Sequence, residues 1–251
     1  MSLAALLALA DSRLPAGGHA HSAGAEQAVN DRYVRDEASL ATLLRRRLLT
    51  TGTVAAHLAA AACAAASRAH ASPDPSPRDQ GIPPPRGVAG SPDHDAVGVG
   101  GRALARLDAE ADARTPAPAA RDASRAQGRG LVRVARAAWP SPAWALLPRA
   151  PHHPLALGVA AAAAGCSPHQ AALVAAYLST TAPATASSRL LGLDPVTVAA
   201  VLARLGPDVE AVAADADRAV ARGEEPAVES DPLSDLLQTR HTPREDKLFA
   251  S

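Results

Sequence analysis

The sequence predicts an all-α protein, a single-domain bundle of roughly 8 to 10 helices. Hydrophobic residues make up 47% of the chain but aromatic residues only 2%, so alanine and leucine must form most of the core. Both are strong helix formers and weak strand formers. Helix start and stop signals also recur along the chain, whereas no β-hairpin signal occurs. The composition and the helix start and stop signals therefore indicate the same fold class.

The domain organisation follows from length and from one change in composition. A chain of 251 residues can hold one large or two small domains, and nothing in the composition divides this one sharply. We therefore expect one all-helical domain over residues 1–230, with a disordered insertion at 72–101 inside it. Residues 231–251 are expected to form a C-terminal tail that is loose in the free protein and becomes ordered when it docks a partner. One turn of helix should place Leu233, Leu236 and Leu237 on one face of this tail.

Two helices are predicted before the insertion. Asp36 suits the N-cap of a helix with leucines at helical spacing, and the arginines at 45–47 are expected to face solvent or a partner. Gly52 permits a break at the end of this helix. An alanine-rich helix, buried on several sides, is then predicted over residues 54–69.

The insertion is defined by its proline content. Seven prolines lie among glycine, aspartate and serine between residues 72 and 101. Such a segment cannot bury enough apolar surface to offset the entropy lost on ordering, so we expect disorder. The glycines at 98–101 are interpreted as a flexible linker, because no strand precedes them as a dinucleotide-binding loop requires.

The second half of the chain predicts a series of helices with clear boundaries. Ser167-Pro168 and Asp194-Pro195 are cap-plus-proline start signals, and Gly223 is a stop signal. Pro183 should leave the carbonyl of Ser179 without its helical hydrogen bond and kink that helix. The predicted helices cover residues 102–113, 120–138, 155–164, 168–190, 195–206 and 208–222.

Charge and cysteine content narrow the function classes. The chain has 25 basic and 25 acidic residues, so it lacks the basic excess of proteins that bind nucleic acid or anionic membranes. No apolar run reaches the ~20 residues that span a bilayer, and no Lys or Arg precedes the short run at 3–10. Cys63 and Cys166 have no metal-ligand spacing and are interpreted as buried thiols. We expect a cytoplasmic protein whose partners are proteins.

Two short motifs suggest chemistry, and neither is complete. Ser22 lies in a variant of the G-x-S-x-G elbow of serine hydrolases, but the elbow needs a preceding strand and none is predicted. His19 and His21 form an H-x-H pair whose imidazoles suit nickel, copper or zinc, although two ligands do not close a site. We therefore predict no catalytic site and no cofactor, with metal binding at His19 and His21 as an alternative.

Four blocks of sequence resemble the urease accessory protein UreF family. Residues 14–26 carry its Leu-Pro, glycine pair, Ser22, Gly24 and Glu26 at the family's spacing. Residues 121–129, 189–193 and 240–251 are similar to its later blocks, in the same order. The resemblance covers roughly residues 3–60, 102–205 and 231–251 and leaves out the insertion, as a tolerated loop extension should. His19 and His21 stand where the family usually has aromatic residues.

The resemblance implies a non-enzymatic scaffold. Such a protein would form a homodimer and bridge a UreD/UreH-type accessory protein and a UreG-type GTPase, so that nickel reaches the urease apoprotein. The alternatives are a nickel-binding metallochaperone that uses His19 and His21 and, more remotely, a serine hydrolase. The residues expected to contact partners are Glu26, Arg121, Arg129, Arg189, Leu233, Leu236, Arg240, His241, Leu248 and Phe249.

Deletion of residues 73–90 is predicted to leave helicity and complex assembly nearly unchanged, because a segment without a packed core contributes little to the folded state. Far-UV circular dichroism and co-purification with the partner proteins measure both properties. A cooperative loss of structure after the deletion would show that the insertion is part of the fold.

Overall fold

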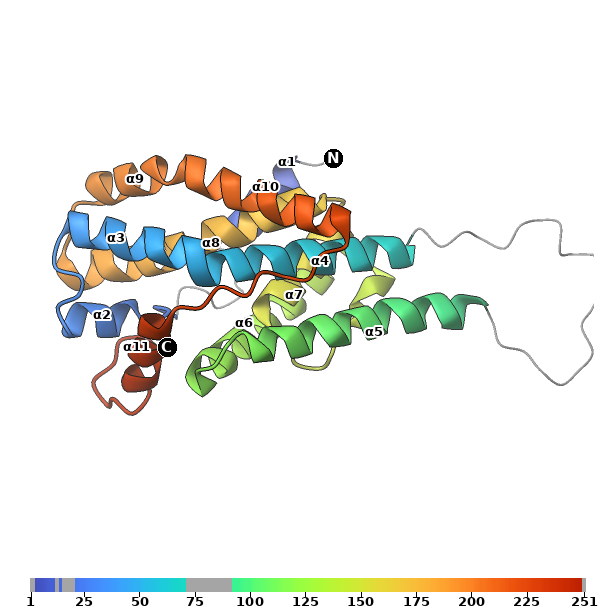
Figure 1. Ribbon diagram of the computed structural model, residues 1–251, viewed down its shortest axis with the longest axis horizontal. Helices are drawn as coiled ribbons and strands as arrows, with labels where there is room; N and C mark the ends of the chain where they lie inside the picture. Colours follow the sequence, from blue (N-terminus) through green and yellow to red (C-terminus); the bar gives the residue numbers. More distant parts are fainter. Residues whose placement is uncertain (1–2, 12–13, 15–20, 71–91, 250–251) are drawn as a thin grey trace, which may run out of the picture.

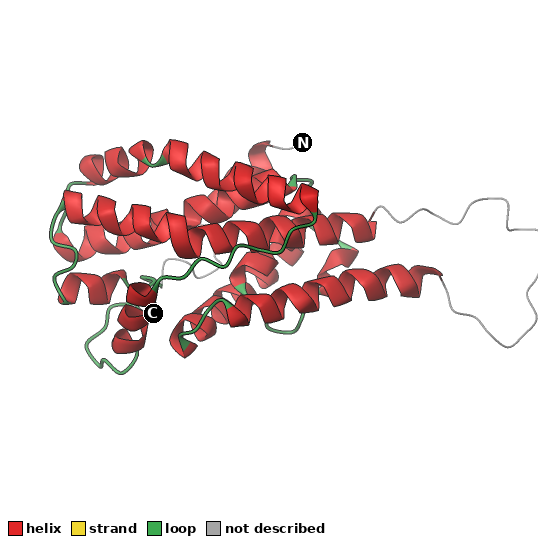
Figure 2. Cartoon of the chain, viewed as in Figure 1, coloured by secondary structure: helices red, strands yellow, loops and turns green. Residues whose placement is uncertain are grey.

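The computed structural model describes residues 3–11, 14, 21–70 and 92–249, and all regular structure in these ranges is helical (Figures 1 and 2). No strand occurs in them, which confirms the all-α prediction. In chain order the elements are α1 (Leu3–Ala10), α2 (Ala25–Asn30), α3 (Glu37–Arg47), the π-helical turn η2 (Leu48–Gly52), α4 (Thr53–His70), α5 (Pro92–Ala113), α6 (Pro118–Ala138), the 3-10 helix η4 (Pro142–Leu146), α7 (His153–Ala163), α8 (Pro168–Leu191), α9 (Pro195–Arg204), α10 (Gly206–Arg222) and α11 (Pro232–His241).

The predicted boundary signals form caps. The side chains of Asp36 and Ser167 each accept a hydrogen bond from the third helical amide of α3 and α8, and each closes a capping box. The side chain of Asp194 accepts hydrogen bonds from the second and third helical amides of α9. Gly192 and Gly223 end α8 and α10 in the left-handed conformation, which glycine adopts at low cost.

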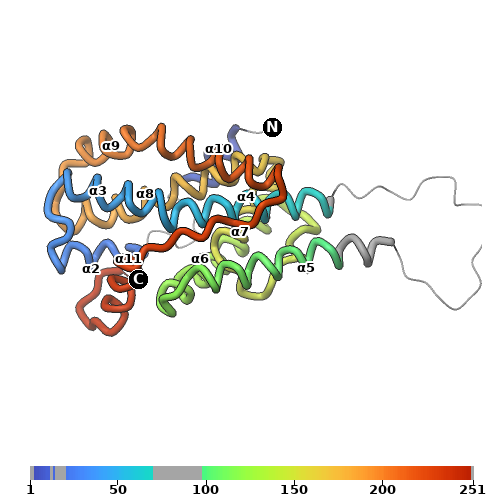
Figure 3. The backbone as a smooth tube through the Cα atoms, viewed as in Figure 1, coloured from blue at the N-terminus to red at the C-terminus, as the bar shows by residue number. Residues whose placement is uncertain are grey.

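Helix α4 is the centre of the bundle and packs against α5, α7, α8 and α10 (Figure 3). Its alanines allow close approach, and at Gly158 of α7 a Cβ would lie 2.3 Å from the carbonyl oxygen of Ala59. The stretch Glu37–Ala69 is long and apolar enough to cross a membrane, but 67% of its most apolar window is buried inside the fold. We therefore interpret it as a core helix.

The predicted break at Gly52 is wrong, because α3, η2 and α4 form one continuous helical segment. Gly52 has a packing role instead. A Cβ at this position would lie 2.6 Å from the Oγ of Ser179 on α8. The absence of a side chain lets α8 pass close to the π-helical turn, which outweighs the low helix propensity of glycine.

The proline inside α8 explains the neighbouring arginine. Helix α8 continues through Pro183, which has no N–H to donate to the carbonyl of Ser179. Arg47 supplies the missing donor, since its Nε lies 3.1 Å from that oxygen. The expectation that Arg47 faces solvent is therefore wrong, and its side chain points into the fold.

The C-terminal boundary of the predicted insertion also needs correction. Helix α5 begins at Pro92, so residues 92–101 are helical and the glycines at 98–101 do not form a linker. Packing offsets their poor propensity: a Cβ on Gly100 would lie 3.1 Å from the Cβ of Ala69. The rest of the predicted insertion, residues 72–91, lies outside the described ranges.

Substitution of Gly158 by alanine is predicted to destabilise the protein by about 1–3 kcal/mol, because the new methyl group would displace the backbone of α4. Gly101→Ala is the matched control. It also lies within a helix, but its Cβ would meet nothing within 4 Å, so this variant should be about 0.5–1 kcal/mol more stable. Urea unfolding measures both changes, and equal effects would contradict the assigned packing.

Candidate functional site

The carboxylate of Glu26 on α2 fastens the C-terminal tail to the domain. Its Oε2 lies 2.8 Å from Nε2 of His241 and accepts from the amide of Phe249 at 3.0 Å. Its Oε1 accepts from the amide of Leu248 at 2.8 Å. Both side chains of this hydrogen-bonded pair are nearly fully buried, with 3% of Glu26 and 1% of His241 exposed. We call this group, formed by Glu26, His241 and residues 248–249, the tail latch.

The hydrogen bonds of the tail latch favour the ionised form of Glu26. Burial acts to raise the pKa of Glu26, but the hydrogen bonds from Leu248, His241 and Phe249 together lower it. Nδ1 of His241 has no partner among the described residues. The tautomer with the proton on Nε2 therefore satisfies the pair, because it donates to Glu26 and leaves no buried N–H unpaired.

Arg47 is a second connection between the tail and the bundle. Besides the Ser179 carbonyl, its guanidinium donates to the carbonyl of Ala23 at 3.0 Å and to the Oγ of Ser234 on α11 at 3.2 Å. The adjacent Arg46 bonds the buried N-cap of α11, Asp231, at 2.7 Å. Consecutive arginines of α3 thus fix the start of the tail helix.

Residues 224–231, which we call the strap, run from α10 to α11 along the outside of α4 (Figure 1). Arg106 of α5 and Arg114, the residue that follows α5, hold this segment. Arg106 pairs with Glu225, and Arg114 donates to the carbonyls of Pro226 at 3.0 Å and Ala227 at 2.8 Å. Polar contacts therefore hold the strap, together with the buried Pro226.

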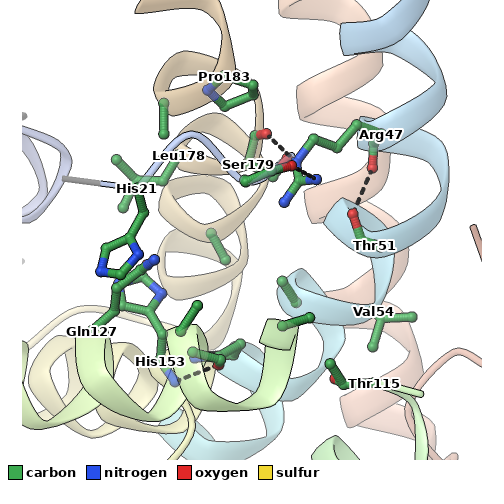
Figure 4. Close-up of a pocket in the computed structure, with 18 of the residues that line it drawn as sticks. His21, Arg47, Thr51, Val54, Thr115, Gln127, His153, Leu178, Ser179 and Pro183 are labelled. Carbon is green, nitrogen blue, oxygen red and sulfur yellow. Dashed lines mark hydrogen bonds between the residues drawn. The ribbon is translucent and has the colours of Figure 1, made fainter. Parts of the chain in front are cut away.

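A cavity of about 690 Å³ lies beneath the strap, between α4, α6, α7 and α8. Parts of the chain that are distant in sequence complete the wall of this cavity: His21, the strap and the tail. Its wall combines apolar and polar side chains, several of which Figure 4 shows. The apolar ones include Leu58, Leu131, Leu157 and Leu178, and the polar ones His21, Arg47, Gln127, His153 and Asp235.

Adjacent histidines at the start of α7 have different roles. His152 is buried, and its ring nitrogens lie 3.0 Å from the Oγ of Ser124 and 2.8 Å from a carboxylate oxygen of Asp112. Both ring nitrogens therefore stabilise the fold. His153 uses only its backbone N–H, which donates to Ser124 at 3.1 Å. Its ring lies in the cavity wall, where removal from water and the nearby His21 lower its pKa to about 4.

The hydrolase interpretation of Ser22 lacks its structural context. Ser22 is fully buried, and its Oγ accepts a hydrogen bond of 3.4 Å from the amide of Glu26, at the start of α2. No strand precedes it in the described residues. His19, half of the predicted H-x-H pair, lies outside those residues. Within them no group of three or more His, Cys, Asp or Glu side chains is placed to hold a metal ion.

The predicted contact residues separate into buried and exposed sets. Glu26, His241 and Phe249 are buried within the chain, and Phe249 packs with Ala25, Ala186 and Leu190. Leu236, Leu248 and Arg129 are exposed. Arg189, at the end of α8, is also exposed, and Leu233 is half-buried. Two further arginines have partners within the chain. Arg240 pairs with Asp31, and Arg121 donates to the carbonyls of Thr115 and Pro116.

The expectation that the tail is loose in the free protein needs correction. Residues 232–241 form α11, and Leu237 is buried in a cluster with Ala28, Leu40 and Leu44. The three tail leucines do not share one face as predicted, because Leu236 is 49% exposed. Intramolecular burial thus orders a helix that is too short to persist alone.

Sequence reasoning missed Arg47, Gln127 and the strap. The signal for Arg47 was present, because Pro183 predicts a carbonyl that needs a donor from elsewhere in the chain. No sequence signal could pair it with an arginine 132 residues away. Gln127 lies within the second block of resemblance, residues 121–129, and the strap has no helix signal of its own.

The family model and the curated relatives that match this chain all carry the same family name. The family model of UreF matches residues 34–206. A urease accessory protein UreF from Mycobacterium sp. strain JLS is 46% identical over 250 residues, covering 100% of this chain and 99% of the relative. The UreF of Mycolicibacterium vanbaalenii is also 46% identical, and that of Mycobacterium tuberculosis strain H37Rv is 39% identical, with the same coverage.

Glu26→Gln is predicted to loosen the tail without unfolding the bundle. The amide presents one acceptor oxygen and one NH₂ donor where the carboxylate accepts three hydrogen bonds, and bonds to a charged group contribute about 1.5–3 kcal/mol each. Hydrogen exchange at the amides of Leu248 and Phe249 should therefore accelerate. Glu37→Gln, which removes an exposed ion pair with Arg204, is the control and should leave these amides protected.

The same latch should respond to acid. Because the folded-state pKa of Glu26 is lowered, its stabilisation is present above the ordinary value of 4.5 and is lost as the pH falls through the folded-state value. The amide chemical shifts of Leu248 and Phe249 should titrate together below that pH in the wild type and stay constant in Glu26→Gln. Identical titrations in both proteins would contradict the assignment.

Proposed function

Because the chain belongs to the UreF family of urease accessory proteins, we propose that it is a non-catalytic scaffold for urease maturation. It brings a UreD/UreH-type accessory protein and a UreG-type GTPase together, as a homodimer within the complex, so that nickel reaches the urease apoprotein. Full-length similarity to UreF proteins supports this role.

The tail is the surface that we assign to the UreD/UreH-type partner. Its inner face is held by the latch, whereas Leu236 and Leu248 are 49% and 77% exposed. Exposed leucines on an ordered segment are suited to an interface core, and the nearby Arg240 and Lys247 suit a polar rim. The exposed leucines of a docked tail are the observation that carries this assignment.

Because the tail is ordered in the free protein, changes to it should affect both the fold and partner binding. Phe249 is buried inside the chain, so its truncation would weaken the complex by loosening the tail rather than by removing a direct contact. Removal of all residues after Glu229 would also take away Asp231 and Ser234, the partners of Arg46 and Arg47. That truncation would disturb the fold, contrary to the simpler expectation of a free tail.

Helix α6 provides a second surface for a partner. It carries five arginines and one aspartate between residues 118 and 138. Arg125 is engaged by Asp108 and Asp112, but Arg129 and Arg133 are exposed. A row of arginines on a chain with no net charge favours an acidic protein surface. We assign this face and Arg189 to partner contacts, whereas Arg121 stabilises the start of α6.

Leu236→Ser combined with Leu248→Ser is predicted to weaken binding of the UreD/UreH-type protein by roughly tenfold or more, as expected for loss of apolar anchors. Thermal stability should not change, because both side chains are exposed. Titration calorimetry measures the affinity. Val196→Ser on α9, where the side chain is 75% exposed, is the matched control. Wild-type affinity in the double variant would remove the tail from the interface.

A further inference from the structure

Gln127 of α6 and His153 of α7 lie together at one end of the cavity. Figure 4 shows both side chains in the cavity wall, next to His21. The backbones meet at this point, since a Cβ on Gly128 would lie 2.1 Å from the carbonyl oxygen of Pro151, two residues before His153. Close packing between α6 and the start of α7 therefore holds the two polar side chains in the same place.

The fold does not use the polar atoms of these two side chains. Among the described residues, His153 makes hydrogen bonds only through its backbone, and the Gln127 side chain has no hydrogen-bond partner. The adjacent His152 provides the contrast, since both of its ring nitrogens are bonded within the chain. The imidazole of His153 and the amide of Gln127 are therefore available to a molecule in the cavity.

An apolar surface begins one helical turn beyond each polar side chain. Leu131 follows Gln127 by four residues and Leu157 follows His153 by four, so each pair shares one face of its helix. Both leucines line the cavity, together with further leucines of α4 and α8. The cavity thus has a polar end and an apolar body, which the same two helices provide.

These features match a small neutral molecule with one polar head. Removal from water and the nearby His21 lower the pKa of His153 to about 4, so its ring is neutral at physiological pH. A neutral imidazole and a side-chain amide each offer both donors and acceptors. Arg47 and Arg114 of the cavity wall already donate to carbonyl oxygens of the chain, and an anion would have to compete with those bonds.

The size of the cavity also suits such a ligand. Pockets for small organic molecules typically measure about 300–1,000 Å³ and combine apolar walls with a few polar groups that orient the ligand. The volume of about 690 Å³ lies within this range. Burial of an apolar group against the leucines would supply most of the affinity, and the polar end would select the head group.

We propose that the cavity binds a small neutral organic molecule with an apolar body and a carboxamide-like head. Gln127 and His153 hold the head, and the apolar body lies against Leu131 and Leu157. This activity goes beyond the scaffold role and is independent of it, because it concerns binding by the isolated chain.

Benzamide and benzoate are a matched pair of probes for the full-length chain at pH 7.5. They share the aromatic ring, but benzoate is an anion. Benzamide should shift the methyl NMR signals of Leu131 and Leu157 in a saturable way, whereas those of Leu202 on α9, outside the cavity lining, should not move. Benzoate should bind roughly tenfold more weakly or worse, because its charge would leave water for a neutral site.

Two variants test the polar end. Gln127→Met and His153→Phe keep much of the side-chain volume but remove the hydrogen-bonding atoms. Each should weaken benzamide binding by about three- to tenfold, the effect of losing one hydrogen bond between neutral groups. His169→Phe, at the start of α8 and outside the cavity lining, is the control and should bind like the wild type.

Three results would overturn the proposal. The first is no saturable shift of the Leu131 and Leu157 methyls with benzamide, and the second is equal affinity for benzamide and benzoate. The third is wild-type affinity in a folded Gln127→Met or His153→Phe variant, with circular dichroism as the check on folding. The comparison of the two probes needs only the wild-type chain, so it decides the outcome even where a variant fails to fold.

Discussion

The hydrogen bond from Arg47 to the carbonyl of Ser179 is the interaction on which the rest of the architecture depends. A proline in the middle of α8 leaves that carbonyl without a helical donor, and the guanidinium replaces the missing N–H. The same planar group has further donors, which reach Ala23 before α2 and Ser234 in α11. One side chain thereby fixes three segments relative to α3. Burial lowers the pKa of Arg47, and the nearby carboxylates of Asp231 and Asp235 oppose this effect.

This arrangement makes the C-terminal tail part of the folded domain. The latch at Glu26 and the contacts of Arg46 and Arg47 hold it at both ends, and Leu237 anchors its middle. A partner that binds the outer leucines therefore meets a surface that is already ordered, and it avoids most of the entropy cost of coupled folding. Substitutions on the inner side of the tail would weaken partner binding by releasing the tail from the domain. Substitutions on the outer side would weaken it by removing direct contacts with the partner.

Local signals predicted the fold well, and tertiary packing explains where they failed. Asp36, Ser167 and Gly223 act within a few residues of themselves, so their roles could be predicted from spacing. Gly52 has the residue type of a helix breaker, yet it remains helical because α8 passes close to it. The candidate site was predicted only in part. Glu26, His241 and Phe249 were identified by resemblance, but their contact with one another spans more than 200 residues of sequence and has no local signal.

The strap has a thermodynamic consequence. It forms one wall of the cavity and leads directly into the helix that carries the exposed leucines. Any ligand that prefers the cavity with the strap closed must therefore favour the docked tail, and a partner that prefers the docked tail must tighten the ligand by the same factor. The polar contacts of Arg106 and Arg114 help to keep the strap in this position. Salt, which weakens the exposed pair between Arg106 and Glu225, would then loosen the hold on the strap.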